Sequence, residues 1–360
     1  MGSGVESWIV VIEMNSLIVM VIIGVVAGSA SYTGVAFIRR WAGRARMLDV
    51  PNVRSSHTRP TLRGGGLAIV VVVLAGLWLL ALGNPVFPWW AMTSLTLGAL
   101  LVAGVSWRDD MRPMSFEVRL LVHALGACVA IMGIGVIRKI SVPLGMDLSL
   151  GWLGFPLTLL WIVGLTNAYN FMDGIDGIAG GQAVAAGVGW AVIGWLGGQP
   201  MVGGVGLLIA AGSLGFLGHN WPPARVFMGD VGSAFLGYTL AVLTVMASQS
   251  NPVFVLAGIA LVWPFVFDSV FTFARRLCRG EKVWMAHRSH LYQRLVITGL
   301  SHGQVSILYI GLATLGAVWA VAVVQGWRVM TVAGVVVVAA AAVSLWGWTC
   351  QRERCSRVSA

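Results

Sequence analysis

Charged residues are scarce in this chain of 360 residues: Asp, Glu, Lys and Arg make up 10% of the sequence, against 58% hydrophobic residues. The surface of a soluble domain is about 25–35% charged, so this composition excludes an ordinary water-soluble protein. No charged residue occurs between Arg63 and Arg108, between Asp176 and Arg225, or between Asp230 and Asp268. Each of these stretches is long enough for two membrane-spanning helices joined by a short neutral turn.

Other common features are missing as well. No set of zinc ligands surrounds the four cysteines, which we expect to be free thiols: Cys128, Cys278, Cys350 and Cys355. No Lys or Arg precedes the first apolar run, as a cleaved signal peptide would require, so we expect the first span to be retained. A Ser-His-Asp order of catalytic residues, a Walker glycine-lysine loop and a cofactor fingerprint are also absent.

About eleven apolar segments are long enough to cross a bilayer, which takes roughly 20 residues. Their approximate centres are Val25, Leu74, Leu97, Gly126, Leu160, Trp190, Leu208, Ala241, Ile259, Leu312 and Val337. We therefore predict an all-α integral membrane protein with a single polytopic domain over residues 1–360. Its transmembrane region is expected at 16–349, followed by a basic cytoplasmic tail at 350–360.

The basic residues indicate the orientation. Seven Arg residues follow the first span and six Lys or Arg residues follow the ninth, so the positive-inside rule assigns these connections to the cytoplasm. Twenty of the 23 basic residues then face inward, and the N-terminus is periplasmic while the C-terminus is cytoplasmic. This sorting accounts for the net charge of +10, and we expect no nucleic-acid partner.

Most acidic residues are also expected on the cytoplasmic side, although acidic residues contribute little to orientation. Ten of the thirteen map to inner loops or inner helix ends, and only Glu6, Glu13 and Asp147 map outside. We therefore expect an active site that uses carboxylates on the cytoplasmic loops.

Two carboxylate motifs stand at inner helix ends. Asp109 and Asp110 follow the third span, with Arg112 and Arg119 close by, and adjacent carboxylates can share a cation or keep one group as a base. The second motif, Asn167 to Asp176, places polar residues at every third position: Asn167, Asn170, Asp173 and Asp176. If this segment is helical, they lie along one narrow face.

Two further motifs supply a turn and a set of donors. The segment from His219 and Asn220 to Phe227 and Asp230 places one carboxylate in a glycine-flanked turn before the eighth span, where backbone N–H groups can meet phosphate oxygens. The segment from His287 to Arg294 is rich in hydrogen-bond donors, including Arg288 and His290. We expect donors rather than a zinc pair, because no further soft ligand accompanies the two histidines. His123 and His302 are expected to be satisfied polar residues.

Carboxylates, amides and arginines are the equipment of phosphoryl transfer, in which positioning and charge neutralisation, commonly by Mg²⁺, lower the barrier. The membrane setting indicates that one substrate is a lipid.

These motifs carry a resemblance to a known family. Together with Pro51–His57 and Pro60–Gly66 in the first inner loop, they run in order from about residue 49 to residue 294 and resemble the polyprenyl-phosphate N-acetylhexosamine-1-phosphate transferases of the bacterial inner membrane. The resemblance implies transfer of a sugar-1-phosphate from a UDP-sugar to undecaprenyl phosphate, with release of UMP and a requirement for Mg²⁺ or Mn²⁺. The histidine segment is most similar to the branch that initiates O-antigen, whose donors include UDP-N-acetylglucosamine and UDP-N-acetylfucosamine.

The resemblance also implies roles for individual residues. Asp109, Asp110 and Asp230 would be catalytic, Asp230 and Asp173 would bind the metal, and Asp109 or Asp110 would deprotonate or orient the lipid phosphate. Asp176 and Asn220 would read uracil, with Phe227 stacked on it. The residues expected to bind substrate are Asn167, Asn170, Asp173, Asp176, Asn220, Phe227, His287, Arg288, His290, Arg112 and Arg119. Direct attack and a covalent aspartyl-phosphate both remain open.

Two other classes are less consistent with the sequence. A CDP-alcohol phosphatidyltransferase also begins its signature as Asp173 to Gly177 does, but it needs two further aspartates soon after, and the next acid here is Asp230. A secondary transporter would place its polar site near the middle of the membrane rather than at one face. Glycine-rich faces such as Gly203, Gly204 and Gly206 could pack against another helix or form a homodimer.

Overall fold

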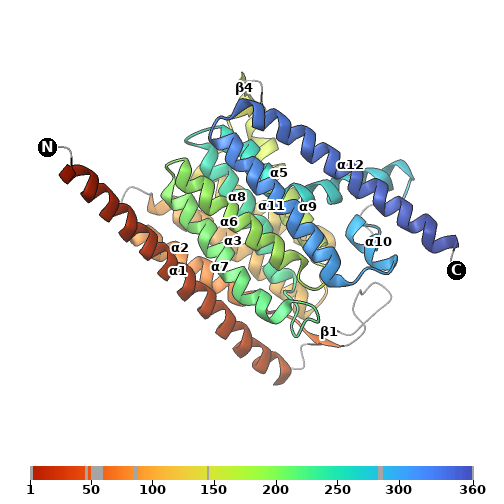
Figure 1. The fold of residues 1–360 in the computed structure, drawn as a ribbon. Coiled ribbons are helices and arrows are strands. Elements are labelled where there is room, and N and C mark those ends of the chain that lie inside the picture. The colour runs from red at the N-terminus through yellow and green to blue at the C-terminus, as the bar shows by residue number, and fades with distance from the viewer. Residues whose placement is uncertain are drawn as a thin grey trace.

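The structure, a computed structural model, describes residues 3–44, 48–49, 60–83, 88–143, 146–282 and 287–358. The chain forms a bundle of long helices with α1 and α12 at its two sides (Figure 1). The Pro51–His57 part of the first-loop motif, together with Arg46 and Arg59, lies outside the described residues.

Eleven apolar helices coincide with the eleven segments expected from the sequence. Within the described ranges, ten are long and apolar enough to cross a membrane, and the eleventh, α2 (Leu67–Leu82), is shorter with 16 residues. The ten are α1 (Ser3–Arg44), α3 (Trp89–Met111), α4 (Phe116–Ile134), α5 (Gly154–Met172), α6 (Ile178–Leu196), α7 (Pro200–Asn220), α8 (Asp230–Ser248), α9 (Val253–Cys278), α11 (His302–Val324) and α12 (Arg328–Val358). The prediction of an all-α integral membrane protein is confirmed. Helix α12 continues without a break through 350–358, so the basic tail extends the last helix.

A few short elements complete the fold. Helix α10 (Leu291–Ile297) follows the histidine segment, and a 3₁₀ turn (Gly151–Leu153) precedes α5. Two small antiparallel pairs lie at opposite ends of the bundle: β1 (Leu48–Asp49) with β2 (Thr61–Leu62), and β3 (Lys139–Val142) with β4 (Met146–Ser149) (Figure 1). The hydropathy pattern did not indicate these strands, because each is too short to produce a period of its own.

Helices α7 and α8 are the most enclosed spans, and α1 and α12 are the most exposed. Small residues allow the close packing of α6 and α7: a Cβ on Gly206 would lie 2.6 Å from the backbone nitrogen of Ala191, and one on Gly203 would lie 3.2 Å from the Ala191 carbonyl. A Cβ on Gly204 would meet Leu80 of α2 at 2.8 Å. These three glycines therefore pack within the chain.

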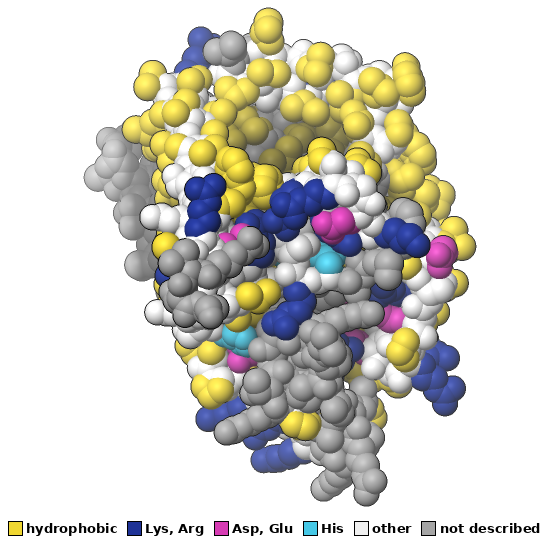
Figure 2. Space-filling model, turned by 90° about the vertical axis from the view of Figure 1, so that its right-hand side faces the viewer, with side chains coloured by type: hydrophobic (Ala, Val, Ile, Leu, Met, Phe, Trp, Pro, Cys, Tyr) yellow, Lys and Arg dark blue, Asp and Glu magenta, His cyan; other side chains and the backbone are white. Residues whose placement is uncertain are grey.

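The chemistry-bearing residues gather at one end of the bundle. The ends of α3, α5, α7 and α9 and the starts of α4, α6, α8 and α11 all meet there, since consecutive spans run in opposite directions. On the face in Figure 2, hydrophobic side chains cover the upper part, whereas basic, acidic and histidine side chains gather in the lower part. Buried helix packing thus brings motifs that are far apart in sequence to one region.

Candidate active site

Hydrogen bonds connect Asp110 at the end of α3 to the start of α8. The two carboxylate oxygens of Asp110 accept hydrogen bonds from the backbone nitrogens of Asp230 (2.9 Å) and Val231 (3.0 Å). Arg63 lies 3.4 Å from the same carboxylate, whose side chain is fully buried. Asp110 therefore satisfies N–H groups of the first turn of α8, which have no partner within the helix.

Arg119 of α4 links the two other carboxylates. Its Nη1 atom lies 2.6 Å from Asp109 and 3.2 Å from Asp230. Asp230 also accepts a hydrogen bond from the Asn170 amide at 3.1 Å, and Ser233 donates to the other end of that amide at 2.8 Å. Four helices, α3, α4, α5 and α8, thus contribute to one network around Asp230.

The glycines of the two loop motifs have a structural explanation. Gly65 and Gly66 donate backbone hydrogen bonds to Phe227 (3.0 Å) and Met228 (2.9 Å), so the first inner loop pairs with the segment that leads into α8. Gly229 has φ +76°, and a Cβ there would lie 2.7 Å from an Asp110 oxygen. A side chain at residue 229 would therefore be strained and would push Asp110 away from the turn.

The expectation of one polar helical face from Asn167 to Asp176 is wrong. Helix α5 ends at Met172, Asp173 caps it with φ −85° and ψ 54°, and Asp176 lies in the following turn. Only Asn167 and Asn170 share the helix. Gly177, the residue that precedes α6, has φ +82°. As a result, Asp173 and Asp176 face different neighbours.

Asp173 lies beside the network around Asp230. Loss of solvent and then the negative charge of Asp230 raise the pKa of Asp173 to about 8. Oxygen ligands of this kind suit a hard divalent cation, which would relieve the repulsion between the two carboxylates. Among the residues that the structure describes, no three His, Cys, Asp or Glu side chains gather closely enough to hold a metal without other ligands.

Asp176 and Asn220 belong to a neighbouring cluster. Asp176 accepts a hydrogen bond from the Ala224 backbone at 3.0 Å, and its carboxylate lies 3.4 Å from His302. Asn220 is buried, accepts from Gly177 at 2.9 Å and donates to Val226 at 2.9 Å, so its amide joins two loops. Phe227, which follows Val226 in the sequence, is half-buried. The expectation that His302 is a satisfied polar residue is confirmed.

The histidine segment lies against the end of α5. The rings of His287 and His290 stack with centroids 5.0 Å apart, and the Tyr292 hydroxyl donates to the Phe171 carbonyl at 3.0 Å. Burial, followed by the neighbouring charge of His290, lowers the pKa of His287 to about 4. A neutral imidazole at this position can accept hydrogen bonds as well as donate them.

Asp268 of α9 anchors this segment, a role that the sequence analysis missed. This fully buried carboxylate accepts from the backbone nitrogens of Leu291 (2.8 Å) and Tyr292 (3.1 Å) and from the Tyr309 hydroxyl (2.6 Å), and lies 3.2 Å from His290 Nδ1. A lone Asp in an apolar span that precedes a basic loop was the only available signal. The partners named above lie 22 to 41 residues away.

An apolar groove of about 600 Å³ ends at the histidine segment. Helices α4, α5 and α9 line it with Phe116, Leu120, Leu157, Leu160, Trp161, Asn167, Phe171, Val266, Val270, Phe273 and Arg276, and His287 and His290 close one end. Asn167 therefore lines the groove rather than the carboxylate network, and its amide donates to Val163 of its own helix at 2.8 Å.

Two residues singled out in the sequence lie outside this arrangement. Arg112 is exposed at the end of α3, and its side chain forms no hydrogen bond or ion pair with any described residue. His123 is buried in α4 beside the Asn167 side chain of α5, and its being a satisfied polar residue stays a prediction.

The fold and the network define a polytopic membrane protein with a cluster of carboxylates and arginines at one end of its helices. The family model described as Glycosyl transferase family 4 matches residues 92–248. A probable undecaprenyl-phosphate N-acetylglucosaminyl 1-phosphate transferase of Bacillus subtilis (strain 168) is 35% identical over 277 residues, which cover 76% of each chain. A phospho-N-acetylmuramoyl-pentapeptide-transferase of Synechococcus sp. (strain JA-2-3B'a(2-13)) is 31% identical over 304 residues, 79% of this chain and 85% of the relative.

A decaprenyl-phosphate N-acetylglucosaminephosphotransferase of Mycobacterium leprae (strain TN) is 27% identical over 335 residues and 83% of each chain. The chain belongs to the polyprenyl-phosphate N-acetylhexosamine-1-phosphate transferase superfamily. It is a phosphotransferase and a multi-pass membrane protein, and the bacterial inner membrane fits both the ten long apolar helices and these relatives. Membership in this family removes the phosphatidyltransferase and transporter alternatives.

Proposed function

We propose that the protein transfers N-acetylhexosamine-1-phosphate from a UDP-sugar to undecaprenyl phosphate, releases UMP and so initiates a lipid-linked glycan such as O-antigen. One observation carries this proposal: an apolar groove large enough for part of a lipid chain lies beside a network of carboxylates and arginines. The relatives' names, which include undecaprenyl-phosphate and decaprenyl-phosphate transferases, support the choice of a polyprenyl acceptor.

Two helices contribute to both the groove and the network. On α4, Phe116 and Leu120 line the groove, and Arg119 between them binds Asp109 and Asp230. On α5, Asn167 and Phe171 line the groove, and Asn170 binds Asp230. A lipid phosphate at the polar end of the groove would therefore lie close to Arg119, whose guanidinium can neutralise phosphate charge.

The carboxylates have different environments, which supports different roles. Asp110 is fully buried and bound to the turn of Asp230, so we assign it to positioning the catalytic turn. Asp109 is 12% exposed and paired with Arg119, and we propose that it orients or deprotonates the acceptor phosphate. Attack by the acceptor phosphate on the donor's β-phosphorus forms the new P–O bond and releases UMP from the old one.

Asp230 and Asp173 would hold the divalent cation that the family implies. Both offer oxygen ligands, and burial, followed by the negative charge of Asp230, raises the pKa of Asp173. Mg²⁺ or Mn²⁺, when bound, would neutralise the donor's diphosphate, whose oxygens would complete the coordination that two carboxylates begin. Asn170 and Arg119 would keep Asp230 oriented toward the cation.

The donor would extend from the network toward the two flanking clusters. We propose that Phe227 and Asp176 contact the uridine, with Asn220 contributing by holding the loops on both sides of Asp176. The histidine segment, with His287, Arg288 and His290, would contact the N-acetylated sugar.

The test is a donor survey with purified full-length protein and undecaprenyl phosphate. A panel of UDP-N-acetyl sugars is supplied one at a time, and UMP release is measured with and without the acceptor. We expect acceptor-dependent UMP release with a distinct preference among the sugars. UMP release that is independent of undecaprenyl phosphate, or absent with every UDP-sugar, would refute the proposed function.

A further inference from the structure

The C-terminal end of α12 lies beside α10, the short helix that follows the histidine segment (Figure 1). Arg294 of α10 binds Glu353 of α12 through two parallel contacts, Nε to Oε1 and Nη2 to Oε2, each of 2.6 Å. Such a bidentate pair fixes both distance and orientation. It joins residues 59 positions apart in the chain.

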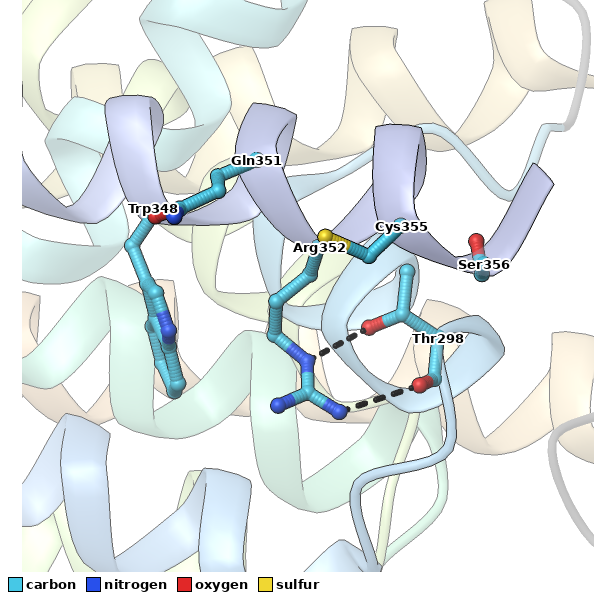
Figure 3. A pocket seen from close by; sticks show the side chains of 6 residues that line it. All are labelled: Thr298, Trp348, Gln351, Arg352, Cys355 and Ser356. Atoms are coloured by element: carbon cyan, nitrogen blue, oxygen red, sulfur yellow. Dashed lines mark hydrogen bonds between the residues drawn. The ribbon is translucent and has the colours of Figure 1, made fainter. Parts of the chain in front are cut away.

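The preceding residue of α12 makes a second contact with the same end of α10. Arg352 donates from Nε to the Thr298 hydroxyl at 3.2 Å and from Nη2 to the Thr298 carbonyl at 3.1 Å, as Figure 3 shows. Thr298 caps α10, and its carbonyl would otherwise lack a helical partner. Two consecutive residues of the last helix therefore bind one end of α10.

The ion pair between Arg294 and Glu353 is largely shielded from solvent. The Arg294 side chain is 8% exposed and that of Glu353 is 31% exposed. A cation with so little solvent around it depends on its counter-charge, and removal of the partner leaves a buried charge uncompensated. Without Glu353, α10 would have to move so that water could reach the Arg294 guanidinium.

The other end of α10 is also held from outside the helix. With seven residues, α10 is too short to be stable alone. Asp268 fixes its first residues and lies 3.2 Å from His290, and the Arg294 backbone donates to the His290 carbonyl at 3.0 Å. The position of His290 therefore depends on an anchor at each end: Asp268 of α9 and Glu353 of α12.

We propose that Glu353 is a positioning residue for donor recognition: through Arg294 it holds α10, and with it His290 and His287, at the end of the groove. The inference rests on the proposed function, which assigns the histidine segment to the sugar. Glu353 lies outside the residues 92–248 that the family model matches. The proposal assigns a role in the active site to the last helix, whose described side chains take no part in the carboxylate network.

Glu353→Gln tests this in full-length protein, because the amide keeps the shape of the side chain and loses its charge. Arg354→Gln is the matched control: Arg354 is the next residue, is exposed and makes no side-chain contact with α10 among the described residues. The double variant Arg294→Glu with Glu353→Arg restores the pair in reverse. KM is measured for the preferred UDP-sugar and for undecaprenyl phosphate, together with the Tm and the hydrogen exchange of residues 287–298.

We expect Glu353→Gln to raise the KM for the UDP-sugar about tenfold to a hundredfold, since small displacements of binding groups have effects of that size. The KM for the lipid and the Tm should stay at the level of the control, exchange over 287–298 should become faster, and the reversed pair should recover most of the affinity. An unchanged donor KM, or an equal loss of both affinities together with the Tm, would overturn the proposal. If the wild-type protein transfers no sugar, the proposed function fails, and the exchange measurement alone decides whether Glu353 holds the segment.

Discussion

Asp110 and Asp230 are joined through the backbone rather than through their side chains: Asp110 accepts a hydrogen bond from the Asp230 nitrogen at 2.9 Å. The Asp230 carboxylate is thereby left to meet Arg119 and Asn170. A fully buried acid at the end of α3 thus sets the position of a less buried acid at the start of α8. The two aspartates should therefore respond differently to the same substitution.

Asp110→Asn should reduce stability, because the amide offers one acceptor where the carboxylate offers two and leaves a buried N–H group unpaired, at a cost of about 1–3 kcal/mol. Asp230→Asn should leave the Tm near that of the wild type but lower turnover about 10²- to 10³-fold, as loss of one preorganised charge typically does. Thermal unfolding and single-turnover rates separate the two effects. A stable Asp110→Asn protein with wild-type turnover would remove Asp110 from this role.

Metal dependence provides the second prediction. EDTA should abolish transfer and Mg²⁺ should restore it, because a diphosphate donor beside Asp230 and Asp173 brings together negative charges that need a cation. Mn²⁺ binding in the presence of the UDP-sugar, followed by electron paramagnetic resonance, should weaken in Asp173→Asn. Asp147→Asn, on the exposed β3–β4 hairpin, is the control and should bind Mn²⁺ normally. Full transfer after exhaustive chelation would contradict the assignment.

The sequence was sufficient for the membrane architecture and insufficient for the details of the site. Apolar segments of about 20 residues predicted all eleven apolar helices, because hydrophobic length is a local property. The end of α5 at Met172 was missed, since the i, i+3 pattern of polar residues continues across the end of the helix. The roles of Asp268 and Glu353 depend on partners up to 41 and 59 residues away, which no local pattern records.

The titration of His287 provides the third prediction. Burial favours its neutral form and lowers its pKa to about 4, so the ring should stay uncharged through the physiological range. An unfolded chain, with an ordinary histidine pKa of about 6.5, binds the proton more readily between these values. The contribution of His287 to stability is therefore present above about pH 6.5 and is lost as the pH falls toward 4.

Nuclear magnetic resonance of ¹⁵N-histidine-labelled protein measures this directly, with His287→Gln used to assign the signal. A midpoint near pH 4 is expected. A midpoint at or above 6.5 would mean that the segment is solvated and that His287 is not held as described.

Orientation in the membrane is the fourth prediction, and it rests on the positive-inside rule. In a protein with its four native cysteines replaced, a Cys at Ser250 should react with an impermeant maleimide added to intact cells. A Cys at Ser356, which is also exposed in the structure, should react only after the membrane is opened. Labelling of the residue-356 cysteine in intact cells would reverse the orientation and place the site outside.

The most direct measurement follows the donor's β-phosphate. With a UDP-N-acetyl sugar labelled with ³²P at the β-phosphate, purified protein and undecaprenyl phosphate should yield labelled lipid and unlabelled UMP in equal amounts. Asp230→Asn should yield neither at a comparable rate, because the network around Asp230 is the proposed centre of the transfer. Label that remains with the nucleotide as UDP while the sugar reaches the lipid would mean that a sugar and not a sugar-1-phosphate is transferred, and would contradict the proposed reaction.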